Sequence, residues 1–380
     1  TPPPVTPTPP PTPAPTPAPT PPPAPQHCGD SKAEGPLRIL GLGGQGYARG
    51  NGGVVSEATL TMHHNSGYSI LTSCTGEWDP GEIVQFKLVG KTISFIVDLS
   101  QVGCACNLAF YLVSAPAIDP DGFPSKGKCL DDLYYCDANK VCGQWCPEVD
   151  IMEANNRVFQ ATPHKCDPPT GTGHYNSCDR NGCAENTRFM PNAYGPGGGF
   201  TIDTTRPFNV STTFNGWGNT LTGMVTALKQ EGRQVTLSHA ACDPAYMAGV
   251  GSAMGPGMSL RITYWGDDPE TMGWMDKPPC GSQSCSGSNA GDGVISSITI
   301  SPPQEGRLTR HISTPRPSPA PLPAPIPPPA PAPAPVISQA PAPAPSPPAT
   351  TPAPAPSPPA TTPAPAPSPP ATTPAPAPSP

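Results

Sequence analysis

The chain has 380 residues, a formal net charge of −7, 65 prolines and 14 cysteines. This acidic balance gives no reason to expect nucleic acid or an anionic membrane as a partner, and no apolar run reaches membrane-spanning length. The cysteines, which all lie between Cys28 and Cys285, indicate an oxidising, extracellular compartment.

Composition divides the chain into three predicted parts. Residues 1–26 are almost wholly Pro, Thr and Ala, whereas residues 27–303 have a globular composition large enough for one domain. Residues 304–380 return to Pro, Ala, Ser and Thr, with repeats that start at Pro341, Pro352 and Pro363. Such tracts cannot build a core and favour extended polyproline II stalks. The chain begins at Thr1 without a signal peptide, so we expect a processed form.

Short apolar runs with Gly-rich joints dominate the central part and predict an all-β sandwich with no helix of more than two turns. Lys229-Gln-Glu-Gly-Arg233 is typical of a hairpin turn. The expected strands are 55–62, 92–99, 107–113, 148–152, 200–204, 208–214, 222–228, 233–238, 258–265 and 294–300.

Residues 148–155, Glu-Val-Asp-Ile-Met-Glu-Ala-Asn, place Glu148, Asp150 and Glu153 in a strand-like apolar run. In a regular strand Glu148 and Asp150 share a face, and Glu153 points to the other. A one-residue β-bulge between Asp150 and Glu153 would return all three to one face. Burying three carboxylates is costly without a role, and glycoside hydrolysis needs such a cluster. For the bare pattern, a solvent-facing acidic strand is the alternative.

The motif is followed by Thr162-Pro-His-Lys-Cys166, and together they resemble glycoside hydrolase family 7. That family of β-1,4-glucan hydrolases carries E-M-D-I-W-E-A-N and then, at the same distance, T-P-H-P-C. The resemblance implies that Glu148 is the nucleophile, Asp150 its supporting acid and Glu153 the general acid/base. It also implies that His164 is a polar group near the departing sugar.

Residues 91–100, 103–114 and 200–208 resemble further strands of the same family. They place Asn107 and Tyr111 at positions that line the sugar sites on the non-reducing side. Trp265 and Trp274 match a pair of family tryptophans that stack on sugar rings on either side of the cleaved bond. Core tryptophans are the alternative. Arg188 is the nearest match to a product-side arginine, one residue out of register.

Several departures from the family pattern affect the expected function. Gly173 stands where a product-side arginine is expected, and Met152 replaces the motif's tryptophan. The N-terminal portion is short, with Trp78 as its only tryptophan. The long loops between the equivalents of Cys136 and Cys146 are deleted. Their loss implies an open cleft with endo-type cleavage, or weakened affinity for glycan.

The resemblance also implies disulfides Cys166–Cys178, Cys183–Cys242 and Cys136–Cys146, and a bond from Cys104 to Cys280 or Cys285. It leaves the pairing of Cys106, Cys129, Cys142 and Cys285 open. A weaker alternative is that Cys104-x-Cys106 or Cys142-x-x-x-Cys146 binds zinc, but no second pair stands at finger spacing. We expect neither metal nor cofactor.

The resemblance implies a concanavalin-A-like jelly roll with a concave glycan cleft. It also implies a secreted, retaining endo-β-1,4-glucanase acting on cellulose or related β-glucans. We expect a monomer without nucleic-acid or membrane partners, and cell-wall association through the Pro-rich tails. Two alternatives stay open. One is a family 16-like β-1,3- or mixed-linked glucanase, and the other is a non-catalytic glycan-binding or matrix glycoprotein on the same fold.

Overall fold

The computed structural model describes residues 33–73, 76–129 and 132–302, all within one compact unit. The Pro-rich segments 1–26 and 304–380 lie outside the described residues, as do the predicted domain limits at 27 and 303. Within the described ranges, no helix is long and apolar enough to cross a membrane.

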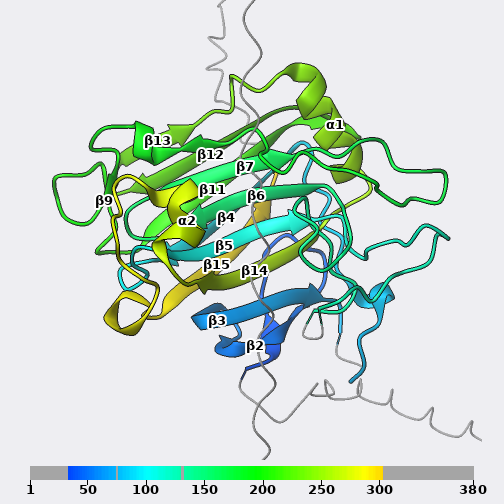
Figure 1. Cartoon of the computed structure of the whole chain (residues 1–380), viewed down its shortest axis with the longest axis horizontal. Helices are drawn as coiled ribbons and strands as arrows, with labels where there is room; N and C mark the ends of the chain where they lie inside the picture. The colour runs from blue at the N-terminus through cyan, green and yellow to red at the C-terminus, as the bar shows by residue number, and fades with distance from the viewer. Residues whose placement is uncertain (1–32, 74–75, 130–131, 303–380) are drawn as a thin grey trace, which may run out of the picture. The chain divides into compact units, whose positions relative to one another are not determined.

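The strands form two antiparallel layers that share β3 (Thr59–Leu71). One layer runs β13-β12-β11-β4-β15-β3, and it contains β4 (Lys91–Asp98), β11 (Phe208–Trp217), β12 (Thr220–Gln230), β13 (Arg233–Leu237) and β15 (Gly293–Ser301). The other runs β3-β14-β5-β6-β7-β8 (Figure 1), and it contains β5 (Cys106–Val113), β6 (Glu148–Ala154), β7 (Phe159–His164), β8 (Glu185–Asn186) and β14 (Ser259–Gly266).

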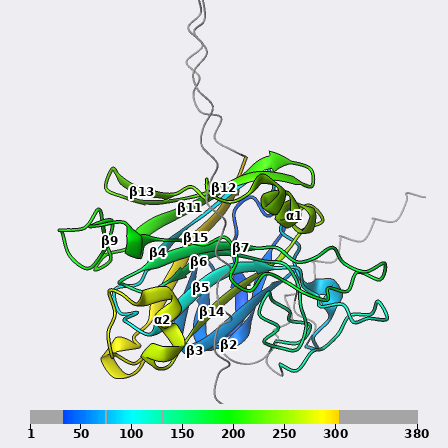
Figure 2. The same ribbon diagram turned by 45° about the horizontal axis from the view of Figure 1, so that its top comes forward.

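Shorter elements complete the described part of the chain. β1 (Gly35–Leu37) pairs with β2 (Gly46–Ser56), and β9 (Tyr194–Gly195) pairs in parallel with β10 (Ile202–Asp203). Single 3₁₀ turns occupy Pro80–Glu82, Thr187–Phe189 and Gly287–Asn289. Helix α1 (Pro244–Met254) lies beside β12 in both views (Figures 1 and 2), and α2 (Pro269–Asp276) follows β14 directly.

The β2–β3 hairpin joins the two layers because it bends in the middle. The first half of β3 pairs with β15, and its second half, from Ser66, pairs with β14. Between the halves, Asn65 has a φ of 63°, and Gly52 on β2 has a φ of 71°. The register with β2 shifts at the same point, between Asn51 and Gly53. These left-handed residues let one hairpin turn from the first sheet into the second.

Alternation along the strands builds the core between the layers. In β11 every second residue from Phe208 to Phe214 is buried, whereas all eight residues of β5 are buried. Phe95 of β4 and Phe110 of β5 stack with ring centroids 4.2 Å apart. The other face of β5 is covered by the β5–β6 connection, where Tyr111 packs in a second cluster with Cys136 and Cys146. β5 therefore has little contact with solvent on either face, which fits its mostly apolar sequence.

Most predicted strands coincide with β4, β5, β6, β11, β12, β13, β14 and β15, and the hairpin turn at 229–233 is confirmed. The predicted strand 55–62 is wrong because it spans the β2–β3 turn, and 200–204 shortens to β10. β7 was not expected. The expectation of no helix beyond two turns is also wrong, since α1 has 11 residues. Asp243 caps α1 and Pro244 opens it, a start signal present in the sequence.

Six disulfides connect described cysteines: Cys104–Cys280, Cys106–Cys285, Cys129–Cys142, Cys136–Cys146, Cys166–Cys178 and Cys183–Cys242. The three pairings implied by the resemblance are confirmed, and Cys104 pairs with Cys280 rather than Cys285. The zinc alternative is wrong, because all four of its proposed cysteine ligands are oxidised in these bonds.

The junction of β14 and α2 depends on Gly266, which has a φ of +146° and would place a Cβ 2.2 Å from the Ala105 carbonyl oxygen. We expect Gly266→Ala to lower the free energy of unfolding by about 2–4 kcal/mol through combined strain and overpacking. Gly197 has a φ of +99° with nothing within 4 Å of its Cβ position. The control Gly197→Ala should therefore cost only about 1 kcal/mol of strain. Urea unfolding measures both, and equal losses would contradict the close-contact argument.

Candidate active site

A β-bulge in β6 presents three carboxylates on one face of the sheet. The register between β6 and β7 shifts between Asp150 and Glu153, which confirms the bulge predicted from the sequence. Ile151 and Met152 are consecutive, yet both are buried in the core between the layers. Glu148, Asp150 and Glu153 consequently all line the cleft on the opposite face. The alternative of a solvent-facing acidic strand is wrong, because Glu148 and Asp150 are buried.

The cleft has a volume of about 1070 Å³ and crosses the strands of this sheet from β2 to β7. Its floor beside Glu153 is a row of small residues that lie opposite one another on neighbouring strands. Ala109 lies opposite Glu153, Thr263 opposite Ala109, and Gly67 opposite Thr263. Because these side chains rise little above the sheet, a sugar ring has room to lie across β5, β14 and β3.

A second row of residues paired across the same strands forms one wall of the cleft. Tyr111 lies opposite Asp150, Arg261 opposite Tyr111, and Ser69 opposite Arg261. Arg261 has no exposed surface, and its Nε lies 2.9 Å from Oδ2 of Asp132. The Ser69 hydroxyl donates to Oδ1 of Asp132 at 3.0 Å. A buried cation therefore lies beneath the wall, with Asp132 covering it at the cleft surface.

Glu148 and Asp150 form a coupled acidic pair. Burial and the neighbouring Asp150 raise the pKa of Glu148 well above its usual range. Burial, followed by the charge of Asp137, raises the pKa of Asp150 in the same direction. Two carboxyl groups so close together share a proton rather than both ionise. The Ala138 N–H donates to Oε2 of Glu148 at 3.0 Å, which favours the anionic form of Glu148.

His164 is buried, and both of its ring nitrogens are engaged. Nε2 lies 3.0 Å from Oδ2 of Asp150. Nδ1 lies 2.8 Å from the carbonyl oxygen of Asp179, which can only accept, so Nδ1 carries a proton. His164 lines the cleft, as expected, but its contacts make it the group that orients Asp150.

Glu153 lies beyond the bulge in a different environment. Burial and then the charge of Asp150 raise its pKa to about 8, so this carboxyl group is protonated at neutral pH. The Asn107 amide donates to Oε1 of Glu153 at 3.1 Å. Asn107 was expected to line a sugar site, but it is fully buried and lies behind the cleft surface. In this position it holds the Glu153 carboxyl group.

The predicted aromatic residues line the cleft. Trp265 is 39% exposed and Trp274 43% exposed, so the core-tryptophan alternative is wrong for both. Tyr111 also lines the cleft, and its hydroxyl lies 3.0 Å from that of Tyr135. Flat, exposed indole rings provide surfaces on which sugar rings stack.

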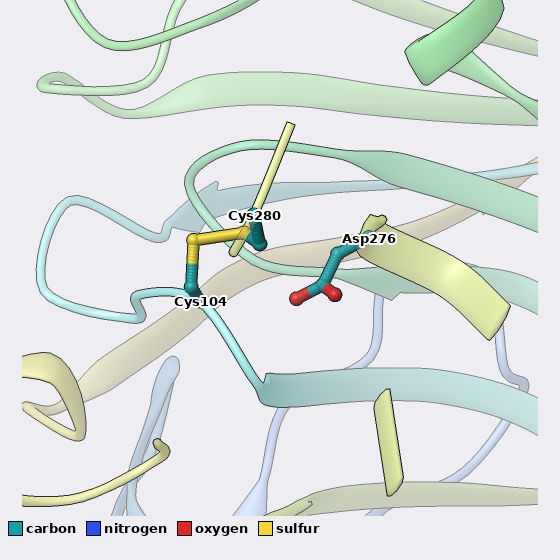
Figure 3. Close-up of side chains that lie close together, drawn as sticks. All are labelled: Cys104, Asp276 and Cys280. Atoms are coloured by element: carbon teal, nitrogen blue, oxygen red, sulfur yellow. A yellow bond between two sulfur atoms is a disulfide. The ribbon is translucent and has the colours of Figure 1, made fainter. Parts of the chain in front are cut away.

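Trp274 is held in place by the anchoring of α2. Just after its C-terminal end, the Cys104–Cys280 disulfide ties the chain to the segment that precedes β5, and Asp276 lies beside this bond (Figure 3). Oδ2 of Asp276 accepts hydrogen bonds from the Ala105 N–H at 2.9 Å and the Asn155 amide at 3.0 Å. The side chains of Asp276, Cys104 and Cys280 lie close enough together to bind a metal ion. The two sulfur atoms are bonded to each other in the disulfide, however, so they are not available as metal ligands.

Arg188 lines the cleft, as expected of a product-side arginine, and it also anchors α2. Its Nη1 donates to the carbonyl oxygens of Trp274 at 2.8 Å and Lys277 at 3.1 Å. These bonds complete the last turn of the helix. Arg188 therefore fixes the position of Trp274.

Five site residues were not identified from the sequence: Asp132, Tyr135, Asp137, Gln160 and Arg261. Gln160 hydrogen-bonds to Glu153, and Asp137 accepts the N–H groups of two residues that follow it in the chain. Tyr135-Cys136-Asp137 precedes a cysteine-rich loop, and this position was the sequence signal that could have identified Tyr135 and Asp137 as site residues. Nothing local marks Arg261 as different from an exposed strand residue, because its partner Asp132 is distant in sequence.

Comparison with known proteins gives a consistent result. The family model described as Glycosyl hydrolase family 7 matches residues 125–246. The chain is 31% identical over 280 residues to endoglucanase EG-1 of Trichoderma longibrachiatum, covering 63% of this chain and 58% of that protein. It is 29% identical over 287 residues to endo-beta-1,4-glucanase celB of Emericella nidulans, covering 58% and 66%. The chain thus spans less than two thirds of either relative.

Solved structures share the fold. The native structure of Humicola insolens endocellulase EGI has a TM-score of 0.53 and 21% identity, covering 66% of this chain and 77% of that one. An endoglucanase I complexed with cellobiose has a TM-score of 0.55 and 19% identity, covering 70% and 95%. The expected concanavalin-A-like jelly roll is confirmed.

The Asp132–Arg261 pair generates a stability prediction. Asp132→Asn leaves a buried guanidinium without its counter-ion, so we expect a loss of about 3 kcal/mol in the free energy of unfolding. The control Glu231→Gln breaks the exposed pair with Arg206 and should cost less than about 1 kcal/mol. Urea unfolding of the two variants measures the difference. Similar small losses would show that Arg261 does not depend on Asp132.

The raised pKa of Glu153 generates a prediction for stability against pH. Between its ordinary pKa of 4.5 and about 8, the folded protein holds a proton that the unfolded chain has lost. The contribution of Glu153 to stability is therefore fully present below pH 4.5 and is lost as the pH rises through about 8. Glu153→Gln should make the melting temperature fall less steeply between pH 5 and pH 8. An unchanged slope would contradict the raised pKa.

Proposed function

We propose that this chain, which belongs to glycoside hydrolase family 7, cleaves internal β-1,4-glucosidic bonds of cellulose or a related β-glucan. The observation that carries the proposal is the bulged strand, which places Glu148, Asp150 and Glu153 together in a cleft with exposed tryptophans. The relatives named endoglucanase and endo-beta-1,4-glucanase support the substrate class. Membership of family 7 argues against the family 16-like alternative.

The proposed mechanism is a double displacement. Glu153, protonated because of its raised pKa, donates its proton to the glycosidic oxygen as the Glu148 carboxylate attacks the anomeric carbon. The carbon–oxygen bond to the leaving sugar breaks, and an ester forms between the sugar and Glu148. Glu153, now ionised, takes a proton from water, whose oxygen attacks the same carbon and breaks the ester. Both carboxyl groups return to their starting states.

The other proposed site residues position these two groups. Asp150 shares a proton with Glu148, and His164 fixes Asp150. Asn107 fixes Glu153. Tyr111, Trp265 and Trp274 contact the sugar rings, and Arg188 fixes Trp274 and borders the product side. No step in this scheme uses a metal or cofactor.

Endo-type cleavage is proposed from the loops. The connection between Cys136 and Cys146 is a short loop closed by a disulfide, and the Cys146 N–H donates to the Asp137 carbonyl oxygen. So short a connection cannot arch over a glycan, and an uncovered cleft admits an internal stretch of polymer without threading from an end.

The setting of the enzyme is also proposed. Six disulfides among the described residues support an extracellular location. The Pro-rich composition of 1–26 and 304–380 supports a domain at 27–303 carried between stalks that associate with the cell wall. We propose that this domain acts as a monomer, because one chain by itself brings Glu148, Asp150 and Glu153 into a single cleft.

Replacing the nucleophile tests the proposal. The full chain should release reducing sugar from carboxymethylcellulose, and Glu148→Gln should lower the rate by more than about 1000-fold while retaining glycan binding. The control Glu57→Gln changes a carboxylate that is exposed beside Arg38 and should leave the rate unchanged. Rates near wild type in Glu148→Gln would refute the assignment. Glycan binding without turnover by the wild type on any β-glucan would support the non-catalytic alternative.

A further inference from the structure

The charges that line the cleft are distributed unequally on the two sides of β6. On the β5 side, Asp132 is committed to Arg261, and Asp137 accepts hydrogen bonds from backbone N–H groups. The cation on that side, Arg49, donates to the carbonyl oxygens of Gly76 and Glu77. On the β7 side, the described lining residues include Arg180 and Arg188 but no carboxylate. The β7 side, which is the product side if Arg188 has its proposed role, is therefore cationic.

Arg180 is the exposed cation of this side, and its terminal nitrogens are free of described partners. Its Nε donates to Oδ1 of Asn139 at 3.3 Å. This bond ties the guanidinium to a residue that also lines the cleft. The neighbouring carboxylate, Asp179, is occupied by the Tyr246 hydroxyl at 3.0 Å and the Asn181 N–H at 3.1 Å. Arg180 consequently has no ion pair within the described part of the chain.

Arg188 cannot serve the same purpose equally well. Its Nη1 donates hydrogen bonds to three backbone carbonyl oxygens at the C-terminal end of α2 and just beyond it. Its Nε is buried without a hydrogen-bond partner. A guanidinium held in this way borders the cleft as a fixed positive charge. Arg180, by contrast, can turn its two terminal nitrogens toward a ligand.

The chemistry that matches a free guanidinium is a planar anion. Its N–H groups form a fork that binds both oxygens of a carboxylate at once. A neutral glucose unit offers hydroxyl groups, which need no cation. An exposed arginine is often only a solvated surface residue, but this one is hydrogen-bonded to Asn139, which lines the cleft.

We propose that the β7 side of the cleft binds a sugar unit that carries a carboxylate, with Arg180 as the residue that determines this specificity. The favoured substrate is then a β-1,4-linked glycan with hexuronate units, and cleavage is directed to the bond on the non-reducing side of such a unit. This inference rests on the proposed function and narrows its substrate class.

Binding tests the inference independently of turnover. In the full chain with Glu148→Gln, which holds sugars uncleaved, titration calorimetry would compare cellotriose with a trisaccharide of the same linkages whose reducing-end unit is glucuronate. We expect the glucuronate ligand to bind about tenfold more tightly at low salt. Raising the salt concentration should reduce this preference because it screens the exposed pair. Adding Arg180→Gln should abolish it.

Arg157→Gln is the matched control, because Arg157 is exposed and does not line the cleft. It removes the same charge and should keep the tenfold preference. Equal affinities for the two trisaccharides, or a preference that survives Arg180→Gln, would overturn the inference. Tighter binding of a sulfated trisaccharide than of the glucuronate one would overturn the carboxylate assignment. Absence of turnover in the wild type would refute the proposed hydrolase function and leave this binding result intact.

Discussion

The arrangement of the site depends on one extra residue in β6. Because Ile151 and Met152 both point into the core, the strand regains its phase and Glu153 joins Glu148 and Asp150 on the cleft face. Without the bulge, period-two alternation would bury Glu153 between the two layers. The apolar contacts of Ile151 and Met152 therefore stabilise the β-bulge, and the bulge places Glu153 beside the other two carboxyl groups. Packing on one face of the sheet sets the geometry of the acids on the other.

The three carboxyl groups then differ by environment. Glu148 receives a backbone N–H from Ala138, in a loop closed by the Cys136–Cys146 disulfide, whereas Glu153 is held by Asn107 from the neighbouring strand. A hydrogen bond to the anion favours ionisation, and burial opposes it. One group is thus prepared to be the anion and another to be the acid. The disulfides act on the same site at a distance, since they fix the loop and the end of α2.

Much of this could be predicted from the sequence, because β6 and the tryptophan pair are encoded in continuous segments. The bulge followed from the spacing of Glu148, Asp150 and Glu153. What could not be predicted depended on pairing across distant segments. Asn107 lies behind Glu153 only because the register of β5 places it there, and Arg261 is buried only because Asp132 covers it. Helix α1 was missed because glycines within it weaken the helical pattern, although its start was capped.

The central claim is that the bulged strand provides a nucleophile at Glu148 and an acid at Glu153. The most direct measurement is to trap the sugar–enzyme ester with a 2-fluoro cellobioside that carries a good leaving group. The fluorine slows both formation and hydrolysis of the ester, but the good leaving group speeds formation. The ester therefore accumulates. Mass spectrometry of the digested protein should find the fluorosugar attached to Glu148. A label on Asp150 or Glu153, or turnover of the reagent without any labelled peptide, would contradict the account.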